Sequence, residues 1–263
     1  MLRHADLLRE ADWVLFPEEW QLGVLVDALR CRVFPSAQSY RYGQDKVQFT
    51  RVVQALFPAN VPETIIARAD EVSARDAADR LGFPMVLKHP RSSMGQGVFK
   101  VESRRELLAM LPGFDVLYAQ EFLEMERDLR VVWIGDRVVT AYWREGGDGF
   151  HHNVARGAQT RFGDVPPEAL ELVARVATAL AIDHAGFDLA EVNGHWYLIE
   201  ANVRFGNFGL KEAGVDTGQI IADWLLRQTP GMDGPEHDPD EPDTPEDPGS
   251  APPFDDPPLA LAG

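Results

Sequence analysis

Residues 186–202 read Gly186-Phe-Asp-Leu-Ala-Glu-Val-Asn-Gly-His-Trp-Tyr-Leu-Ile-Glu-Ala-Asn202. Branched and aromatic side chains, which favour β-strands, lie on both sides of the Asn193-Gly194 pair. An Asn-Gly pair between two such runs is a strong hairpin signal, because both residues accept the backbone angles of a tight turn. The sequence therefore predicts two antiparallel strands, and the polar side chains on them become candidates for a shared site.

Turn length decides which of these polar side chains meet, because successive residues of a strand face opposite sides of a sheet. A two-residue turn would place Asp188 opposite Ile199. A three-residue loop that extends to His195 places Asp188 opposite Glu200 instead. With the longer loop, Asn202 then shares the face of both carboxylates. Two carboxylates and an amide oxygen bind Mg²⁺ when nucleotide phosphates supply the remaining ligands. The alternative is an ordinary polar face of a sheet.

A second candidate site follows a short apolar run that ends at Lys88. The next residues form a loop rich in small side chains, among them Ser93, Gly95 and Gly97. Small residues let backbone N–H groups approach phosphate oxygens closely, and a lysine at the strand end can neutralise those oxygens. The chain contains no GxxxxGK[ST] motif. Taken alone, such a loop is more often a plain hairpin connection than a phosphate site.

Short β-branched runs alternate with helical patterns through residues 1–230, which predicts a mixed α/β architecture. Residues 1–44 hold one small β-α-β unit, with strands at 12–16 and 31–34 around a helix over 18–30. Further helices are predicted to begin at Asp45, Ser73, Ser103, Pro167 and Asp216. Further strands are predicted at residues 85–88, 98–101, 116–122, 129–134, 137–143, 186–192 and 195–200.

The composition is that of an ordinary soluble protein of one or two domains, with 263 residues, 45% hydrophobic and 25% charged. The net charge of −17 argues against nucleic acid or an anionic membrane as the main partner. Residues 231–263 carry −10 of that charge together with nine prolines, and we expect them to form a disordered acidic tail. A single cysteine, Cys31, and the lack of a signal-like or membrane-spanning apolar run favour a cytoplasmic protein.

Seven short motifs occur in order between residues 45 and 216, and each is weak alone. They are Asp45-Lys46, Pro84-Met-Val-Leu-Lys88, Gly95-Gln-Gly-Val98, Gln120-Glu-Phe-Leu123, Asp128-Leu-Arg130, Ala185-Gly-Phe-Asp188 and Glu200-Ala-Asn202. This ordered set resembles the ATP-grasp superfamily, and most closely its RimK-type carboxylate–amine ligases. The resemblance implies an ATP-grasp fold in which two α+β subdomains, about 45–123 and about 124–230, clamp the nucleotide behind a shortened N-terminal unit.

The resemblance also implies roles for single residues on the phosphate side. Lys46 and Lys88 match the two lysines that reach the nucleotide phosphates. Ser93, Gly95 and Gly97 match a mobile loop that covers them. The implied nucleotide is ATP with magnesium, as two ions for which Mn²⁺ can substitute.

Other residues match the base, the ribose and the reacting groups. Glu121 and Phe122 match the linker whose backbone pairs with adenine, and Asp128 matches the carboxylate that holds the ribose. Arg144 matches the arginine that stabilises charge on the transferring groups, and Asn153 is the one family residue retained in its segment. The magnesium ligands of the family match Asp188, Glu200 and Asn202, in agreement with the face that the hairpin predicts.

Two departures from the family pattern bear on chemistry. His151-His152 replaces Arg-Ser before Asn153. Val203-Arg204-Phe205-Gly206 replaces the usual Ala-Ser-Pro-Gly and adds a cation and an aromatic ring on the acceptor side. Arg204 is either a ligand for a substrate carboxylate or a surface charge.

The resemblance implies an ATP-dependent carboxylate–amine ligase that works through an acyl phosphate and releases ADP and phosphate. Its partners would be small-molecule or peptide carboxylates and amines. The alternatives are an ATP-binding regulatory or interaction protein without turnover and an ATP-grasp kinase. Residues 1–44 are too short to bury their own apolar side chains, so either the chain's core or a second copy in a homo-oligomer must cover them.

Overall fold

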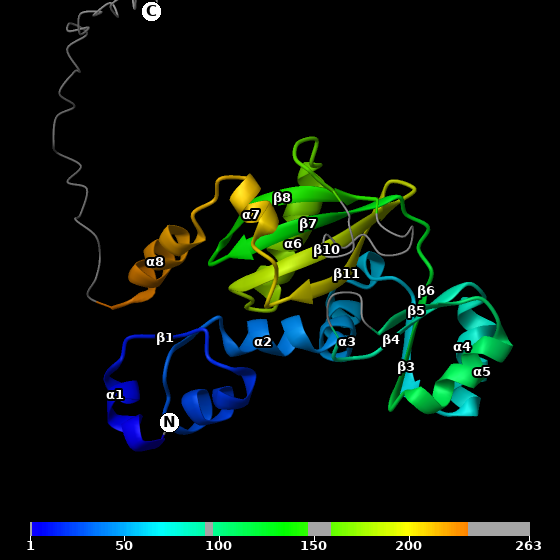
Figure 1. Ribbon diagram of the computed structural model, residues 1–263, viewed down its shortest axis with the longest axis horizontal. Coiled ribbons are helices and arrows are strands. Elements are labelled where there is room, and N and C mark those ends of the chain that lie inside the picture. The colour runs from blue at the N-terminus through cyan, green and yellow to red at the C-terminus, as the bar shows by residue number, and fades with distance from the viewer. Residues whose placement is uncertain (1, 93–96, 147–158, 231–263) are drawn as a thin grey trace, which may run out of the picture.

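A computed structural model describes residues 2–92, 97–146 and 159–230 of the chain (Figure 1). Across those ranges the strands form a two-stranded, a four-stranded and a five-stranded sheet. The predicted tail at 231–263 lies outside the described residues, as do Ser93, Gly95 and the segment 151–153 with its two histidines and Asn153.

The four-stranded sheet, called the small sheet here, has the order β3-β6-β4-β5 with antiparallel neighbours. Its strands are β3 (Thr64–Arg68), β4 (Met85–Lys88), β5 (Val98–Val101) and β6 (Val116–Glu121). The helices α4 (Glu71–Leu81) and α5 (Arg104–Met110) lie together on one side of it, and η5 (Leu111–Gly113) follows α5 (Figure 1). An apolar core between helices and sheet leaves the opposite face of the sheet for polar side chains.

Helix α4 begins earlier than the sequence predicted. The Asp70 side chain accepts a hydrogen bond from the backbone N–H of Ser73 at 2.9 Å and so forms the N-cap. Ser73 therefore lies in the first turn of the helix rather than at its start, because aspartate and serine are both good caps and the sequence alone does not choose between them. The helix ends, as expected, at Gly82 with a φ of +69°.

The five-stranded sheet, called the large sheet here, has the order β11-β10-β7-β8-β9. Its strands are β7 (Arg127–Ile134), β8 (Arg137–Glu145), β9 (Gln159–Arg161), β10 (His184–Val192) and β11 (His195–Asn202). One face packs on α6 (Pro167–Ala179) and α3 (Lys46–Leu56). The opposite face is covered at one end by α7 (Phe208–Glu212) and α8 (Thr217–Gln228), and its other end carries polar side chains.

The β10–β11 hairpin pairs as predicted but for a different reason. Val192 pairs with His195, so the turn has two residues, and Asn193 and Gly194 adopt φ angles of +53° and +76°. A β-bulge between Asp188 and Leu189 then shifts the register by one residue. The turn is therefore the shorter of the two alternatives, yet the bulge restores the pairing of Asp188 with Glu200 that the longer loop would have given.

The N-terminal unit comprises η1 (Leu2–His4), α1 (Ala5–Glu10), β1 (Val14–Leu15), η2 (Glu19–Gln21), the π-helix η3 (Gly23–Ala28), β2 (Val33–Phe34) and α2 (Ala37–Gln44). The single helix predicted over 18–30 is therefore divided in two. Strands β1 and β2 pair in parallel. Phe34 is buried with the side chains of the large sheet, and the indole N–H of Trp13 donates to Thr229 Oγ1 at 2.9 Å. The chain's own core thus covers this part of the unit.

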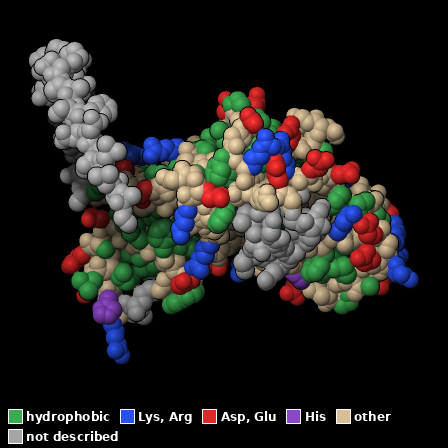
Figure 2. Space-filling model, turned by 45° about the horizontal axis from the view of Figure 1, so that its top comes forward, with side chains coloured by type: hydrophobic (Ala, Val, Ile, Leu, Met, Phe, Trp, Pro, Cys, Tyr) green, Lys and Arg blue, Asp and Glu red, His purple; other side chains and the backbone are tan. Residues whose placement is uncertain are grey.

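Apolar side chains remain exposed elsewhere on the N-terminal unit. Figure 2 shows hydrophobic side chains gathered at the left of the molecule, over this unit and its surroundings. The largest exposed ones are Leu7, Leu15, Phe16 and Trp20.

Candidate active site

Four charged side chains form a buried cluster on the polar face of the large sheet. Strand register places Asp188 opposite Arg130 and Asp128 opposite Arg144. Arg130 donates to both oxygens of Asp188, with Nη2 3.0 Å from Oδ2. Arg144 donates to both oxygens of Asp128 at 2.6 Å, and its Nη2 also lies 3.0 Å from Asp188 Oδ1. Two guanidinium groups and two carboxylates therefore compensate one another inside the protein.

The arginines decide the charge of Asp188. Burial raises the pKa of this carboxyl, but the charges of Arg130 and Arg144 outweigh burial and hold the pKa below its usual value. Burial lowers the pKa of Arg144, and the charges of Asp188 and Asp128 more than reverse that effect. Asp188 is thus a carboxylate at neutral pH, the form in which it can bind a cation.

The two remaining candidate metal ligands lie on strand β11. Asn202 Nδ2 donates to Glu200 Oε1 at 2.9 Å. Glu200 is the cross-strand partner of Asp188, so the three side chains share one face as the sequence predicted. The described residues hold no group of three or more His, Cys, Asp or Glu side chains that could bind a metal. The set of two carboxylates and one amide nevertheless fits Mg²⁺ in kind, because Mg²⁺ binds few protein oxygens and takes the others from phosphate.

Lys46 reaches this set from the first turn of α3, which Asp45 caps by accepting hydrogen bonds from the N–H groups of Val47 and Gln48. The Lys46 ammonium lies 3.4 Å from Glu200 Oε2 and donates to the carbonyl oxygen of Ser92 at 2.5 Å. Ser92 is the last described residue before the small-residue loop. Lys46 therefore links the candidate metal site to the candidate phosphate loop.

Lys88 faces the same place from the end of β4. Its ammonium donates to Gln120 Oε1 at 2.6 Å and is almost completely buried. Burial lowers the pKa of Lys88 to about 8, while the charges of Glu200 and Asp188 raise this pKa and that of Lys46 lowers it. The Lys88 ammonium thus lies within electrostatic reach of carboxylates on the large sheet.

A hydrogen-bonded network beneath Lys88 was not predicted from the sequence. Gln120 Nε2 donates to Thr64 Oγ1 at 2.8 Å, and the hydroxyls of Tyr118 and Thr50 lie 2.7 Å apart. The signal was the alternation of polar residues at 118 and 120 within an apolar strand. The same alternation at 128 and 130 identifies Arg130, whose contact with Asp188 the sequence reasoning also missed.

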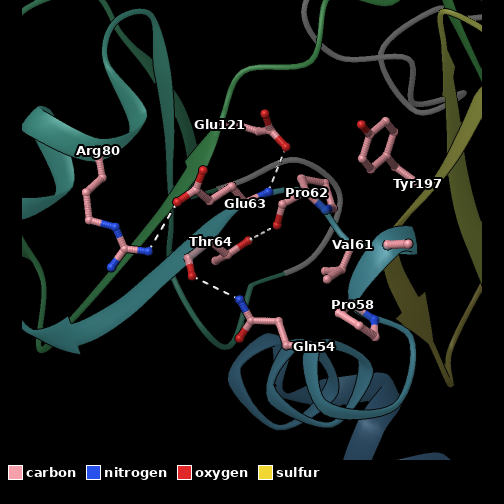
Figure 3. A pocket seen from close by; sticks show the side chains of 10 residues that line it. Gln54, Pro58, Val61, Pro62, Glu63, Thr64, Arg80, Glu121 and Tyr197 are labelled. Carbon is pink, nitrogen blue, oxygen red and sulfur yellow. Dashed lines mark hydrogen bonds and ion pairs between the residues drawn. The ribbon is translucent and has the colours of Figure 1, made fainter.

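The linker between the two sheets borders a cavity of about 450 Å³ (Figure 3). Glu121 from β6 and Tyr197 from β11 both line the cavity, so it lies between the two sheets. The Glu121 carboxylate accepts a hydrogen bond from the N–H of Glu63 at 2.7 Å, and the ammonium of Lys100 lies 4.7 Å from the ring centre of Phe122. The other lining residues are Gln54, Pro58, Ala59, Val61, Pro62, Glu63, Thr64 and Arg80, which include part of η4 (Pro58–Asn60).

Among the predicted loop residues only Gly97 is described. Its φ is +89°, and a Cβ at this position would lie 2.9 Å from a ring carbon of His89. Glycine is therefore required where the loop rejoins β5. Asp128 lies in the buried cluster with both oxygens bound by Arg144, so a ribose contact would require that pair to open.

Comparisons with known proteins agree on one family. A protein-family sequence model described as a RimK-like ATP-grasp domain matches residues 43–225. A probable alpha-L-glutamate ligase of Enterobacter sp. (strain 638) is 32% identical over 181 residues, 65% of this chain and 60% of that protein. A ribosomal protein bS6–L-glutamate ligase of Escherichia coli is 29% identical over 177 residues, 64% of this chain and 59% of that protein. The chain thus spans about three-fifths of the length of these curated relatives.

A solved structure shares the fold. The crystal structure of a RimK domain ATP-grasp protein from Sphaerobacter thermophilus superposes with a TM-score of 0.64 at 20% sequence identity. The match covers 82% of this chain and 81% of that one. Both sheets and their helices therefore belong to a known arrangement.

Proposed function

This chain belongs to the RimK-like ATP-grasp family, and on that premise we propose that it is an ATP-dependent ligase that joins a carboxylate to an amine. The observation that carries the proposal is the convergence of two lysines with metal-type carboxylates. Lys46 lies 3.4 Å from Glu200, and Lys88 is near enough for the charges of Glu200 and Asp188 to act on its pKa. A site for a nucleoside triphosphate with magnesium needs both kinds of side chain, because lysines neutralise the phosphates and carboxylate oxygens bind the metal.

The proposed reaction has two steps. An oxygen of the substrate carboxylate attacks the γ-phosphorus of ATP, which breaks the bond to the β-phosphate oxygen and gives an acyl phosphate and ADP. The amine then attacks the acyl carbon, loses a proton, and expels phosphate as the amide forms. Neither step needs a side-chain nucleophile, so the protein contributes positioning and charge neutralisation.

In this proposal Lys46 and Lys88 neutralise the nucleotide phosphates, under the loop that contains Ser93, Gly95 and Gly97. Arg144, together with Asn153, stabilises charge on the transferring groups. Arg144 can do so because it bridges Asp128 and Asp188, and exchange of either contact for a phosphoryl oxygen would keep its charge compensated.

Asp188, Glu200 and Asn202 are the proposed magnesium ligands, for two ions that Mn²⁺ can replace. Bound magnesium would neutralise charge on the phosphate oxygens. Arg130 keeps Asp188 ionised before any cation arrives. The linker residues Glu121 and Phe122 are the proposed partners of adenine, and the neighbouring cavity offers room for the base. Asp128 remains the proposed ribose ligand.

The proposed substrates are a small-molecule or peptide carboxylate and an amine. The names of the two curated relatives, both glutamate ligases, support an amino acid as one of them. No helix in the described ranges is both long and apolar enough to cross a membrane. We place the reaction in the cytoplasm, and a homo-oligomer that covers the exposed apolar side chains of the N-terminal unit is part of the proposal.

A panel of amine and carboxylate pairs tests the function. The full chain with ATP and Mg²⁺ is expected to release ADP and phosphate in equal amounts only when both a carboxylate and an amine are present. Release of ADP with one acceptor alone, and without free phosphate, would indicate a kinase instead. Binding of ATP without turnover across the common amino acids and dipeptides would indicate a regulatory protein and would overturn the ligase proposal.

A further inference from the structure

The loop that leaves β11 carries an exposed ion pair across a long stretch of sequence. Arg204 Nη2 lies 2.6 Å from Glu18 Oε2, and the two side chains are 60% and 56% exposed. Exposed pairs of this kind contribute only about 0–1 kcal/mol to stability. The fold therefore does not depend on this pair, and both of its charges are open to solvent and to ligands.

The same loop lies against the candidate active site. Gly186 lies between this loop and Arg130. A Cβ atom added to Gly186 would lie 3.2 Å from Phe205 Cβ and 2.8 Å from Arg130 Nη1. Phe205 therefore packs beside the guanidinium that holds Asp188. Arg204 follows the candidate metal ligand Asn202 by two residues and adjoins Phe205, so its backbone lies beside the proposed site.

Each partner of the ion pair is also held by contacts of its own. The backbone N–H of Glu18 donates to Gln21 Oε1 at 2.8 Å, at the start of η2. Arg204 also lies close to the Tyr40 hydroxyl, which donates to the carbonyl oxygen of Pro17 at 2.5 Å. When the pair opens, the backbone of Glu18 and the side chain of Arg204 would each keep a contact of their own, while the Glu18 carboxylate turns away from Arg204.

We propose that Arg204 binds the carboxylate of the amine substrate, so that the ligase selects an amino acid over a simple amine. This inference rests on the proposed function. The Glu18 carboxylate occupies the place of the substrate carboxylate in the free protein. A guanidinium fork matches a carboxylate in shape and charge, and exchanging one carboxylate for another keeps the hydrogen bonds of Arg204 satisfied.

The proposal makes opposite predictions for the two partners of the pair. Glu18→Gln removes the anion that competes for Arg204, so the KM for the amino acid should fall about threefold. Arg204→Gln removes the carboxylate ligand, so that KM should rise about tenfold or more, the size of one charge-assisted hydrogen bond. The KM for ATP should stay unchanged in both. A bridge that only fastens the N-terminal unit would make both variants change in the same direction.

The exchange variant Glu18→Arg with Arg204→Glu separates the two roles further. It keeps an ion pair of reversed polarity, so a structural bridge predicts wild-type kinetics, whereas the proposal predicts the raised KM of Arg204→Gln. Arg227→Gln is the matched control, because Arg227 forms another exposed pair, 3.6 Å from Asp136, on α8. This control should leave every KM unchanged.

The amine used is the common L-amino acid that gives the fastest turnover in the substrate panel, with ethylamine and butylamine as amines that lack a carboxylate. Equal shifts in Glu18→Gln and Arg204→Gln, wild-type kinetics in the exchange variant, or no shift in Arg204→Gln would each overturn the proposal. Turnover with simple amines but with no amino acid would overturn it too, and would leave the ligase function standing.

Discussion

The two sheets bring opposite electrostatic conditions to the same site. On the small sheet, Lys88 is buried against neutral partners, with Gln120 as its hydrogen-bond acceptor. On the large sheet, Arg130 and Arg144 are buried against carboxylates that match them in number. Among the described residues, the small sheet therefore has a cation with no carboxylate within salt-bridge distance, whereas the large sheet has a closed set of ion pairs.

This difference indicates what a ligand must supply to each side. Lys88 is destabilised in its charged form by burial, and an anion such as phosphate would relieve that cost. The large sheet gains nothing from an anion alone, because each guanidinium already has a carboxylate. A cation that competes for Asp188 would free Arg130 or Arg144 for the anion. Nucleotide and metal are thus expected to bind as one unit rather than separately.

The largest effect is expected for Asp188→Asn. The change leaves Arg130 buried without its carboxylate, and an uncompensated buried charge costs about 3–5 kcal/mol. The free energy of unfolding, measured by urea titration at pH 7, should fall by that amount.

The double variant Asp188→Asn with Arg130→Met is the control for this loss. Removing the orphaned cation should restore part of the stability, although turnover stays absent. If the free energy of unfolding of the single variant fell by less than about 1 kcal/mol, Arg130 would not depend on Asp188 for charge compensation.

Glu200→Gln should change activity more than stability. Glu200 is 24% exposed, and its partner Lys46 keeps the bond to the Ser92 carbonyl oxygen, so the fold should lose less stability than in Asp188→Asn. Turnover should fall more than about 100-fold, because loss of a metal ligand itself should cost more than loss of a residue that only hydrogen-bonds to a ligand. Glu191→Gln, an exposed change on the opposite face of β10, is the control. Full activity with unchanged magnesium dependence in Glu200→Gln would remove this residue from the metal site.

The sequence is sufficient for the fold and family because the motifs keep their order along the chain. The match over residues 43–225 and the superposition on a solved ATP-grasp protein confirm both predictions. Local signals also located most elements, such as the two-residue turn at Gly135-Asp136 between β7 and β8. Strand β3 and helix α2 were not predicted, because their short segments lack a clear apolar period of their own.

The features that the sequence could not give depend on pairing between distant residues. The bulge at Ile199, opposite Asp188 and Leu189, depends on the register of β11 on β10, and no local signal marks it. Arg130 meets Asp188 across 58 positions of sequence, and that contact follows only from the register of β7 on β10. Local patterns thus specify elements, whereas the charges of the site are matched by tertiary structure.

Lys88 should give nucleotide binding a pH dependence that the large sheet does not share. The pKa of Lys88 is lowered to about 8, and only the charged form attracts phosphate. Above pH 8, ATP affinity in calorimetry should therefore weaken by up to about tenfold for each pH unit. Lys88→Met should bind ATP more weakly and without this dependence, and should bind adenosine as the wild type does.

Stability should move in the opposite direction over the same range. Between the folded pKa of about 8 and the ordinary value of 10.5, the unfolded chain binds more protons than the folded one. The free energy of unfolding therefore rises with pH in this window, and the contribution of Lys88 disappears in Lys88→Met. ATP affinity and stability that rise together above pH 8 would contradict a buried lysine whose hydrogen-bond acceptor is the neutral Gln120.

The smallest effect is expected at the linker that joins the two sheets. The Glu121 carboxylate accepts one hydrogen bond, from the N–H of Glu63 at 2.7 Å, near the surface. Glu121→Ala should therefore cost about 0.5–1.5 kcal/mol of stability. ATP affinity should change less than about twofold, because the linker is proposed to pair with adenine through its backbone, which alanine retains. A tenfold loss of ATP affinity with intact stability would instead place the Glu121 side chain itself against the nucleotide, and the small sheet would then present an anion as well as a cation to its ligand.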